Sequence, residues 1–296
     1  MDFAAIAAEL GALTGARCAA APERRVPGGS INECYRWPSS HGALFVKLAP
    51  RAALPMFQAE AAGLVELAHA RAVRVPRVLA SGQAAAAAFL ALEWIEAGAG
   101  AGAAACEARL GEGLAALHAV TAAQFGWLRD NTIGSTAQVN TPGADWAEFF
   151  RERRLRPQLE LAVRRGFGAL LGEPGERLLQ GLPGLLGAHR PAASLLHGDL
   201  WGGNWLVAAS GEPVLFDPAV YYGDRETDVA MTHLFGGFGA AFYLAYDAAA
   251  PLPSGWQTRQ RLYNLYHVLN HANLFGAAYA RQASHSIAQL LALVRG

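Results

Sequence analysis

The chain contains little lysine, few cysteines and no long hydrophobic run. Of its 24 basic residues, 23 are arginine, and Lys47 is the only lysine. These basic residues are balanced by 24 acidic ones and form no long positive block, so neither a nucleic-acid partner nor a membrane partner is expected. The three cysteines, Cys18, Cys34 and Cys106, are odd in number and widely spaced, which offers neither a disulfide framework nor a zinc-binding spacing.

The longest apolar run covers residues 84–92 and is shorter than the ~20 residues that span a bilayer. The first residues lack the basic flank of a signal peptide. We therefore expect a cytoplasmic protein. A chain of 296 residues is long enough for one large domain or two lobes.

The stretch at residues 195–218 carries three polar side chains at informative spacing, Asp199, Asn204 and Asp217. Apolar runs on both sides of a Ser-Gly-Glu-Pro turn predict a hairpin that returns Asp217 to Asn204. Phosphoryl transfer needs a carboxylate that orients the attacking hydroxyl and, five residues later, an amide that shares magnesium with a second carboxylate. The pattern fits the kinase catalytic loop, except that Gly198 replaces its arginine. Any one of these pieces alone would be interpreted as an ordinary turn or strand exit.

The first part of the chain predicts a nucleotide-binding lobe that would accompany this catalytic loop. A glycine turn lies between two extended segments and precedes a strand at 43–48 that carries Lys47, as in the small lobe of kinases. A compact ammonium bridges phosphate oxygens better than a guanidinium, so this lysine is a candidate phosphate ligand, although codon bias explains the depletion itself. Glu60, on a helix predicted at 55–70, is its candidate partner. The turn supplies five further candidate nucleotide contacts, Gly28, Gly29, Ser30, Ile31 and Asn32.

Further patterns predict the remaining elements. An amphipathic helix is expected at 2–13 and strands at 75–79 and 89–95, and the Gly- and Ala-rich residues 96–102 mark a lobe boundary. In two-lobed kinases adenine bonds to the backbone at this hinge, here Glu93, Trp94 and Ile95. Further helices are predicted at 106–120, 146–166, 177–189, 259–281 and 284–295. The expected fold is α+β and two-lobed, with a nucleotide-binding lobe at 1–95 and a mostly helical catalytic and substrate-binding lobe at 96–296.

Several polar residues have plain structural interpretations. His118 is interpreted as a core residue, and residues 125–140 as a surface loop. His267 and His271 are four residues apart on a predicted helix, which would suit zinc, but no third ligand accompanies them.

The motifs together resemble the fructosamine kinase family, also called ketosamine-3-kinases, within the aminoglycoside-phosphotransferase group of protein-kinase-like folds. The likeness covers nearly the whole chain. The motifs that carry it are GGSIN at 28–32, FVK at 45–47, FGW at 125–127, HGDLWGGN at 197–204, DPAVYYGDRETDVAM at 217–231 and LYHVLNHANLFG at 265–276. The resemblance implies ATP- and Mg²⁺-dependent phosphorylation of the 3-hydroxyl of ketosamines, which are small sugar adducts of amines or glycated protein lysines. The product releases the sugar, so the activity amounts to deglycation.

The resemblance also implies roles for individual residues. Asp199 would orient and deprotonate the sugar hydroxyl, Asn204 and Asp217 would hold the metal, and Lys47, positioned by Glu60, would neutralise the nucleotide phosphates. Asp228 would accept amides of the catalytic loop, a structural role. Four residues would contact the ketosamine through a ring face or a carboxylate, namely Trp201, Tyr222, Asp224 and Glu226.

Two other functions stay open at this point. One is phosphorylation of another small alcohol, such as an aminoglycoside or a choline-like compound, and the other is a nucleotide-binding regulator without turnover. A protein kinase is disfavoured because six residues between Asp217 and Asp224 leave no room for an activation segment. Cys34 follows the glycine turn, where partial exposure and the positive field of Lys47 and backbone amides would favour a reactive thiolate. The alternative is a small side chain that faces the sheet and is buried and inert. The protein is therefore expected as a monomer or as a redox-sensitive homodimer joined through Cys34.

Overall fold

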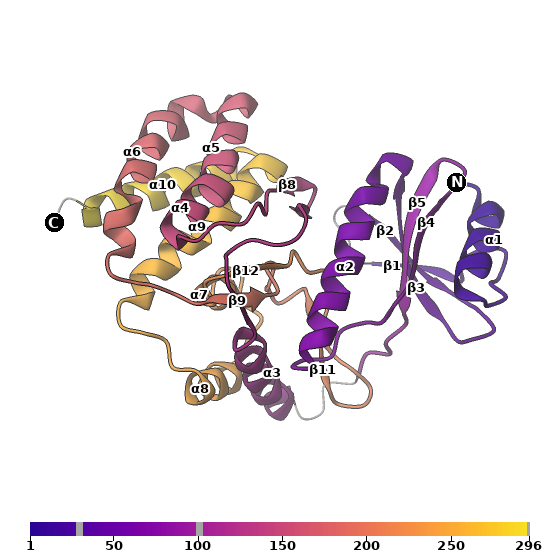
Figure 1. The fold of residues 1–296 in the computed structure, drawn as a ribbon. Helices are drawn as coiled ribbons and strands as arrows, with labels where there is room; N and C mark the ends of the chain where they lie inside the picture. The colour runs from indigo at the N-terminus through magenta and orange to yellow at the C-terminus, as the bar shows by residue number, and fades with distance from the viewer. Residues whose placement is uncertain (28–31, 99–102, 295–296) are drawn as a thin grey trace.

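The computed structural model describes residues 1–27, 32–98 and 103–294, and its N-terminal part is built on an antiparallel sheet. The strand order is β1-β2-β3-β5-β4. The strands are β1 (Arg24–Val26), β2 (Glu33–Trp37), β3 (Leu44–Pro50), β4 (Val78–Ala84) and β5 (Ala87–Glu93). Helix α1 (Phe3–Thr14) covers one face of the sheet and α2 (Leu54–Ala70) the other, as Figure 1 shows.

The alternation of side chains along β3 decides which face each residue serves. Leu44, Val46 and Leu48 enter the core under α1, whereas Ala49 belongs to the core under α2. Because successive side chains of a strand point to opposite faces, Lys47 projects toward α2. The sheet therefore delivers the single lysine to the face on which Glu60 lies.

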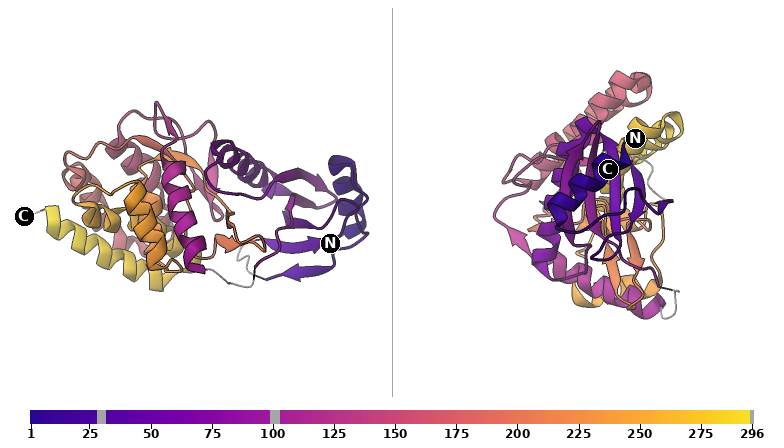
Figure 2. Two further views of the ribbon diagram at one scale, coloured as in Figure 1. Left: turned by 90° about the horizontal axis from the view of Figure 1, so that it is seen from below. Right: turned by 90° about the vertical axis from the view of Figure 1, so that its right-hand side faces the viewer.

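The rest of the chain forms a larger, mostly helical body beside the sheet, and the two termini lie at opposite ends of the molecule (Figures 1 and 2). Its helices are α3 (Ala103–His118), α4 (Trp146–Phe150), α5 (Arg156–Ala162), α6 (Gly168–Leu186), α7 (Glu226–Thr232), α8 (Ala240–Ala249), α9 (Trp256–Phe275) and α10 (Ala277–Val294). Two π-helical segments, Arg151–Leu155 and Val163–Phe167, join α4, α5 and α6. The architecture is the expected α+β fold with two lobes. The predicted boundary at residues 95 and 96 falls just after β5 and stays a prediction.

Three small antiparallel sheets lie in the larger lobe. Strand β9 (Ala193–Leu196) pairs with β12 (Tyr221–Gly223) and β6 (Thr121–Ala122). Strands β10 (Trp205–Val207) and β11 (Pro213–Leu215) form the predicted hairpin, with Trp205 opposite Leu215. A second hairpin joins β7 (Asn131–Ile133) to β8 (Thr136–Gln138). These short strands position the loops that carry the polar side chains described below.

The structure corrects several predicted element boundaries. The strand predicted at 75–79 is β4, which begins at Val78 and ends at Ala84, and two helices also differ. The helix predicted at 259–281 is two helices, because Gly276 adopts a φ of 96°, which ends α9 before α10 begins. The helix predicted from residue 177 begins at Gly168, since Pro174 and Pro183 lie within α6 instead of ending it.

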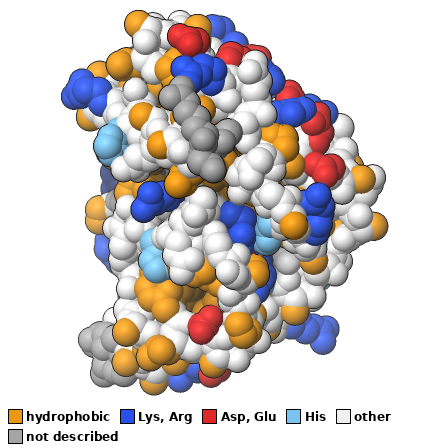
Figure 3. All heavy atoms as spheres, turned by 90° about the vertical axis from the view of Figure 1, so that its left-hand side faces the viewer, with side chains coloured by type: hydrophobic (Ala, Val, Ile, Leu, Met, Phe, Trp, Pro, Cys, Tyr) orange, Lys and Arg blue, Asp and Glu red, His pale blue; other side chains and the backbone are white. Residues whose placement is uncertain are grey.

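The surface of the described residues carries charges of both signs, and the helices show no membrane-spanning character. On the face drawn in Figure 3, Arg, Asp and Glu side chains are interspersed with hydrophobic ones. None of the helices in the described residues combines the length and apolar character needed to cross a bilayer.

Candidate active site

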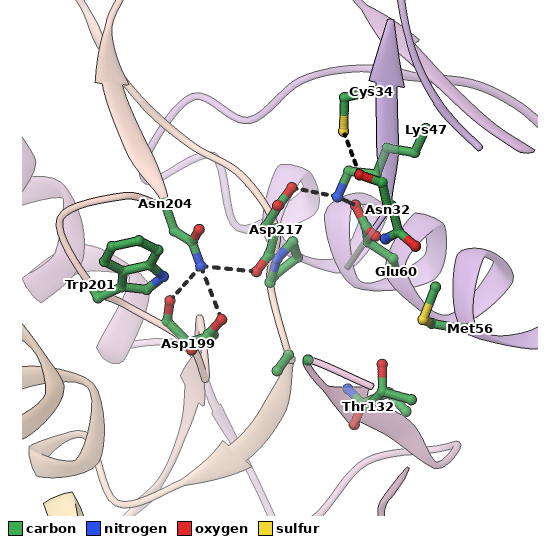
Figure 4. A pocket seen from close by; sticks show the side chains of 14 residues that line it. Asn32, Cys34, Lys47, Met56, Glu60, Thr132, Asp199, Trp201, Asn204 and Asp217 are labelled. Atoms are coloured by element: carbon green, nitrogen blue, oxygen red, sulfur yellow. Dashed lines mark hydrogen bonds and ion pairs between the residues drawn. The ribbon is translucent and has the colours of Figure 1, made fainter. Parts of the chain in front are cut away.

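The loop between β9 and β10 carries Asp199 and Asn204, and the hairpin returns the chain to Asp217 beside them (Figure 4). The Asn204 side-chain amide donates to the Asp199 backbone oxygen at 2.9 Å and to Asp199 Oδ2 at 3.0 Å. The backbone of Phe216 donates to Asn204 O at 3.0 Å, which fixes the end of the hairpin. The three residues singled out by spacing therefore share one site.

Asp228, in the first turn of α7, fixes the backbone of the loop that carries Asp199. Its carboxylate accepts the backbone amides of His197 at 2.7 Å and Gly198 at 2.8 Å, and His118 Nε2 lies 3.3 Å away. Burial alone would raise the pKa of Asp228, but its contact with His118 and the loop amides hold that pKa below the ordinary value. His118 is buried, as expected, and its other ring nitrogen bonds to Tyr246.

The ammonium of Lys47 joins the two lobes by ion pairs. It lies 2.6 Å from Glu60 Oε1 on α2 and 2.5 Å from Asp217 Oδ1. Burial works against its charge, but the two carboxylates outweigh burial and raise the pKa of Lys47 above its ordinary value. Because Lys47 is almost fully buried, its charge is fixed at the point where the hairpin meets the sheet.

The Asp199 carboxylate has an environment suited to accepting a proton. Burial, followed by the negative charge of Asp217, raises the pKa of Asp199 to about 7. A carboxylate with such a pKa matches a general base that works near neutral pH.

Asn204 and Asp217 suit a magnesium site, because each has a side-chain oxygen that could bind the ion. The amide nitrogen of Asn204 is held by Asp199, so its Oδ1 is left to face a cation. Lys47 engages Oδ1 of Asp217, and the other carboxylate oxygen is available. Asp217 adopts a φ of 55°, an uncommon value for a residue other than glycine, and such backbone strain is often kept at functional sites. Oxygen ligands of this kind are those that Mg²⁺ prefers.

Two pockets meet at this cluster. The larger, of about 460 Å³, is lined by the hinge residues Glu93, Trp94 and Ile95 together with apolar side chains from both lobes. Arg24 and Arg36 lie over the Trp94 ring at 5.5 and 5.3 Å. Apolar side chains beside backbone groups of the predicted hinge make this pocket a candidate site for adenine. The four glycine-turn candidates Gly28, Gly29, Ser30 and Ile31 lie outside the described residues.

The smaller pocket, of about 140 Å³, contains the candidate catalytic and metal-binding groups. Asn32, Lys47, Glu60, Asp199, Asn204 and Asp217 all line it. Trp201 borders both pockets and is 40% exposed, so its ring is available to a ligand. The pocket thus joins a candidate phosphate side to a candidate acceptor side.

Asp224 and Glu226 do not face this pocket, which corrects their assignment as ketosamine contacts. Both are buried, with Asp224 bonded to His189 and Tyr263 at 2.7 and 2.6 Å, and Glu226 held by Arg259. Tyr222 is also occupied, since its hydroxyl donates to Glu66 at 2.7 Å. The two carboxylates thus bind side chains of α9, and the hydroxyl joins β12 to α2, instead of meeting an acceptor.

His267 and His271 on α9 belong to no group of three possible metal ligands in the part of the chain that the structure describes. His271 Nδ1 donates to the His267 backbone oxygen at 2.8 Å, and burial lowers the pKa of His267 to about 3. Among the described residues, the one group with three possible metal ligands is His189, Asp224 and Glu226, and Arg259 already pairs with its Glu226.

The expectation of a reactive Cys34 is wrong. Its side chain is 6% exposed, and burial raises the pKa of the thiol to about 11 despite the nearby Lys47. A buried thiol of high pKa is poorly reactive. The structure therefore gives no support to a homodimer joined through Cys34.

The sequence patterns did not predict that the β7–β8 hairpin contributes to the site. Asn131, Thr132 and Gly134 line the smaller pocket opposite Asp199. Asn131 donates to Val220 O at 2.8 Å, and Gln138 to Ala219 O at 3.1 Å, which docks the hairpin on the chain that follows Asp217. The available signal was the density of Asn, Thr and Gln in a segment interpreted as a surface loop.

The fold and this site define a protein-kinase-like phosphotransferase. Aminoglycoside phosphotransferase APH(4)-Ia shares the fold, with a TM-score of 0.62 over 97% of this chain and 98% of its own at 14% identity, in a ternary complex with AMP-PNP and hygromycin B. The sequence profile of the family described as fructosamine kinase matches residues 2–293, and the chain belongs to that family.

Individual relatives agree with this assignment. A probable ketoamine kinase of Synechocystis sp. is 46% identical over 97% of this chain and 96% of its own length. A chloroplastic protein-ribulosamine 3-kinase of Arabidopsis thaliana is 38% identical over 91% of this chain and 82% of its own. The crystal structure of a putative fructosamine-3-kinase from Thermobifida fusca YX-ER1 has a TM-score of 0.85 and 34% identity, covering 97% of this chain and 98% of that one.

Proposed function

We propose that this protein uses ATP and Mg²⁺ to phosphorylate the 3-hydroxyl of ketosamines and thereby starts their deglycation. The observation that carries the proposal is the placement of Asp199, whose pKa is raised to about 7, in a small pocket with Lys47 and beside the exposed ring of Trp201. The names of the relatives in Synechocystis and Arabidopsis supply the acceptor class.

Each residue has a defined part in the proposed reaction. Asp199 accepts the proton of the sugar hydroxyl while the hydroxyl oxygen forms a bond to the γ-phosphorus and the bond to the β-phosphate oxygen breaks, releasing ADP. Lys47, fixed by Glu60, stabilises the negative charge of the phosphates. Asn204 and Asp217 hold Mg²⁺, which neutralises phosphate charge when bound. Asp228 keeps the loop amides in place and has a structural part.

The same arrangement suits the nucleotide. We assign adenine to the pocket at Glu93, Trp94 and Ile95, which opens onto Asn204 and Asp217. This places the phosphates between the hinge and Asp199, with Lys47 at one side. The proposed lobe boundary at residues 95 and 96 then lies at the hinge, which lets the 1–95 and 96–296 lobes close on the nucleotide.

Two other functions remain distinguishable by experiment. Turnover of an aminoglycoside or choline-like alcohol needs the same Asp199, and a regulator without turnover needs only the nucleotide pocket. All of Lys47, Asp199, Asn204 and Asp217 are present and assembled, which favours an active enzyme.

The test is ADP formation with a panel of acceptors. Fructose-, ribulose- and erythrulose-derived ketosamines of one amine should be phosphorylated, with loss of the sugar afterwards seen by NMR. Hygromycin and choline serve as the competing acceptors. Activity on these alone, or nucleotide binding with no turnover of any acceptor, would refute the proposal.

A further inference from the structure

A row of ring side chains runs from the small pocket across the larger lobe. We call it the aromatic strip; its members are Trp201, Phe235, His271, Phe275 and Tyr279. Successive ring centroids are 6.4 Å apart from Trp201 to Phe235, 4.8 Å from Phe235 to His271, and 5.3 Å from His271 to Phe275. Tyr279 lies 5.1 Å from His271 and 6.2 Å from Phe275. The contacts are continuous, so the strip is one surface.

Three members of the strip are open to solvent. Trp201 is 40% exposed, Phe235 38% and Phe275 54%. Large apolar side chains in a contiguous exposed row are characteristic of binding surfaces, whereas single exposed ones need no explanation.

The loop that carries Phe235 is held against the catalytic loop. Gly236 and Gly237 adopt φ values of 75° and 95°, and a Cβ on Gly202 would lie 2.8 Å from the Gly237 Cα. Trp205 Nε1 donates to Gly237 O at 3.3 Å. Close backbone contact of this kind fixes Phe235 relative to Asp199, so its exposure near the pocket does not result from a detached loop.

The strip also presents groups that suit an amine. The carboxylates expected to attract the amine, Asp224 and Glu226, are buried elsewhere, whereas ring faces attract ammonium groups. His271 donates through Nδ1 to His267 O, which leaves Nε2 as an acceptor in the neutral ring.

We propose that the aromatic strip binds the peptide that carries a glycated lysine, so that peptide-borne ketosamines are preferred over adducts of small amines. The inference rests on the proposed function. In a ketosamine the amine is attached two carbons from the reacting hydroxyl, so its substituent leaves the pocket near Asp199, next to Trp201. The ring-to-ring path from Trp201 to Phe275 is longer than one lysine side chain and corresponds to roughly five residues of extended peptide at ~3.4 Å each.

The test compares two acceptors with the same sugar. One is a hexapeptide with a central fructosyl-lysine and apolar flanking residues, and the other is fructosyl-glycine. The measured quantity is the ratio of kcat/KM for the peptide to that for the small adduct. Phe235→Ala and Phe275→Ala should each lower this ratio by about 5- to 10-fold, the value expected for one aromatic contact.

Leu244→Ala is the matched control, because Leu244 is a 72% exposed apolar side chain on α8 that is not a member of the strip. It should leave the ratio within twofold of wild type, and thermal melting should show all variants folded. A wild type that prefers fructosyl-glycine, or an unchanged ratio in both Phe variants, overturns the strip alone. If only a ribulose- or erythrulose-derived adduct is phosphorylated, the same comparison is made with that sugar. A wild type that phosphorylates none of the three kinds of adduct overturns the proposed function and, with it, the strip.

Discussion

Replacing Lys47 with Met should separate its contribution to folding from its contribution to catalysis. The side chain of Lys47 is 4% exposed and that of Glu60 12%, whereas that of Asp217 is 41% exposed. Lys47→Met leaves the Glu60 carboxylate buried without its cation. Removing one partner of a buried ion pair costs about 3–5 kcal/mol. Water reaches Asp217, so the loss should fall at or just below the bottom of that range, at ~2–3 kcal/mol.

The pH dependence of this loss follows from Glu60. Burial already raises the pKa of Glu60, and removing Lys47 takes away the group that opposes the rise. A carboxyl whose pKa is higher in the folded state favours folding when protonated, so its penalty is greatest above the ordinary glutamate pKa of ~4.3. The stability deficit of Lys47→Met should therefore be largest near pH 8 and shrink toward pH 5.

The assay is urea unfolding of four proteins at both pH values: wild type, Lys47→Met, Glu60→Gln and the double variant. Lys47→Met should lose roughly 5 °C or more in a parallel melting curve. The double variant should regain most of that stability at pH 8, yet both proteins with Met at 47 should lose at least ~100-fold in kcat/KM. A deficit that grows as the pH falls, or a double variant no more stable than Lys47→Met, would refute the reasoning.

Three further changes test the site. Asp199→Asn should lower kcat by at least ~100-fold, because the proton acceptor is lost, while calorimetry shows ATP affinity within about twofold of wild type; near-normal turnover would remove Asp199 from the mechanism. Asp228→Asn should cost about 1–3 kcal/mol in urea unfolding, since an amide oxygen cannot satisfy both loop N–H groups, and a stability equal to wild type would contradict that role. Cys34→Ser should leave peroxide sensitivity as in wild type, and maleimide should label the partly exposed Cys18 before Cys34; the reverse order would show that Cys34 is accessible.

Local patterns sufficed where the reacting groups lie on regular elements. The apolar runs around a turn predicted the β10–β11 hairpin, and the structure confirms it. The strand with Lys47 and the helix with Glu60 also follow from periodicity, because strand alternation and helix packing bring the two side chains to the same face. The central residues of the site could therefore be predicted from their spacing in the sequence.

Other features depended on contacts that spacing does not encode. Asp224 and Glu226 follow Tyr222 closely in sequence, but their carboxylates turn inward to His189 and Arg259, which come from distant segments. The exposure of Cys34 was misjudged for a similar reason: its place after the glycine turn did not reveal that its side chain would be covered.

The wall of the pocket opposite Asp199 depends on a buried cation. Arg154 is fully buried and, within the described residues, forms no ion pair; its guanidinium donates to Val139 O and to Asn140 Oδ1 and lies 3.9 Å from the Tyr221 ring centroid. Burial of such a charge is tolerated only where hydrogen bonds and ring faces replace water.

Through Asn140, this cation is linked to the hairpin that lines the pocket. Asn140 donates to Asn131 Oδ1 at 2.9 Å, Gln138 donates to the same oxygen at 2.8 Å, and Tyr266 of α9 donates to Gln138 at 2.7 Å. Each side-chain amide in this network is hydrogen-bonded, and of the network's polar side-chain atoms only Nε of Arg154 is left without a partner among the described residues. The network therefore holds Asn131 and its neighbours in one arrangement. The acceptor side of the pocket is therefore preorganised by the helical lobe, while the nucleotide side depends on the meeting of both lobes at Lys47.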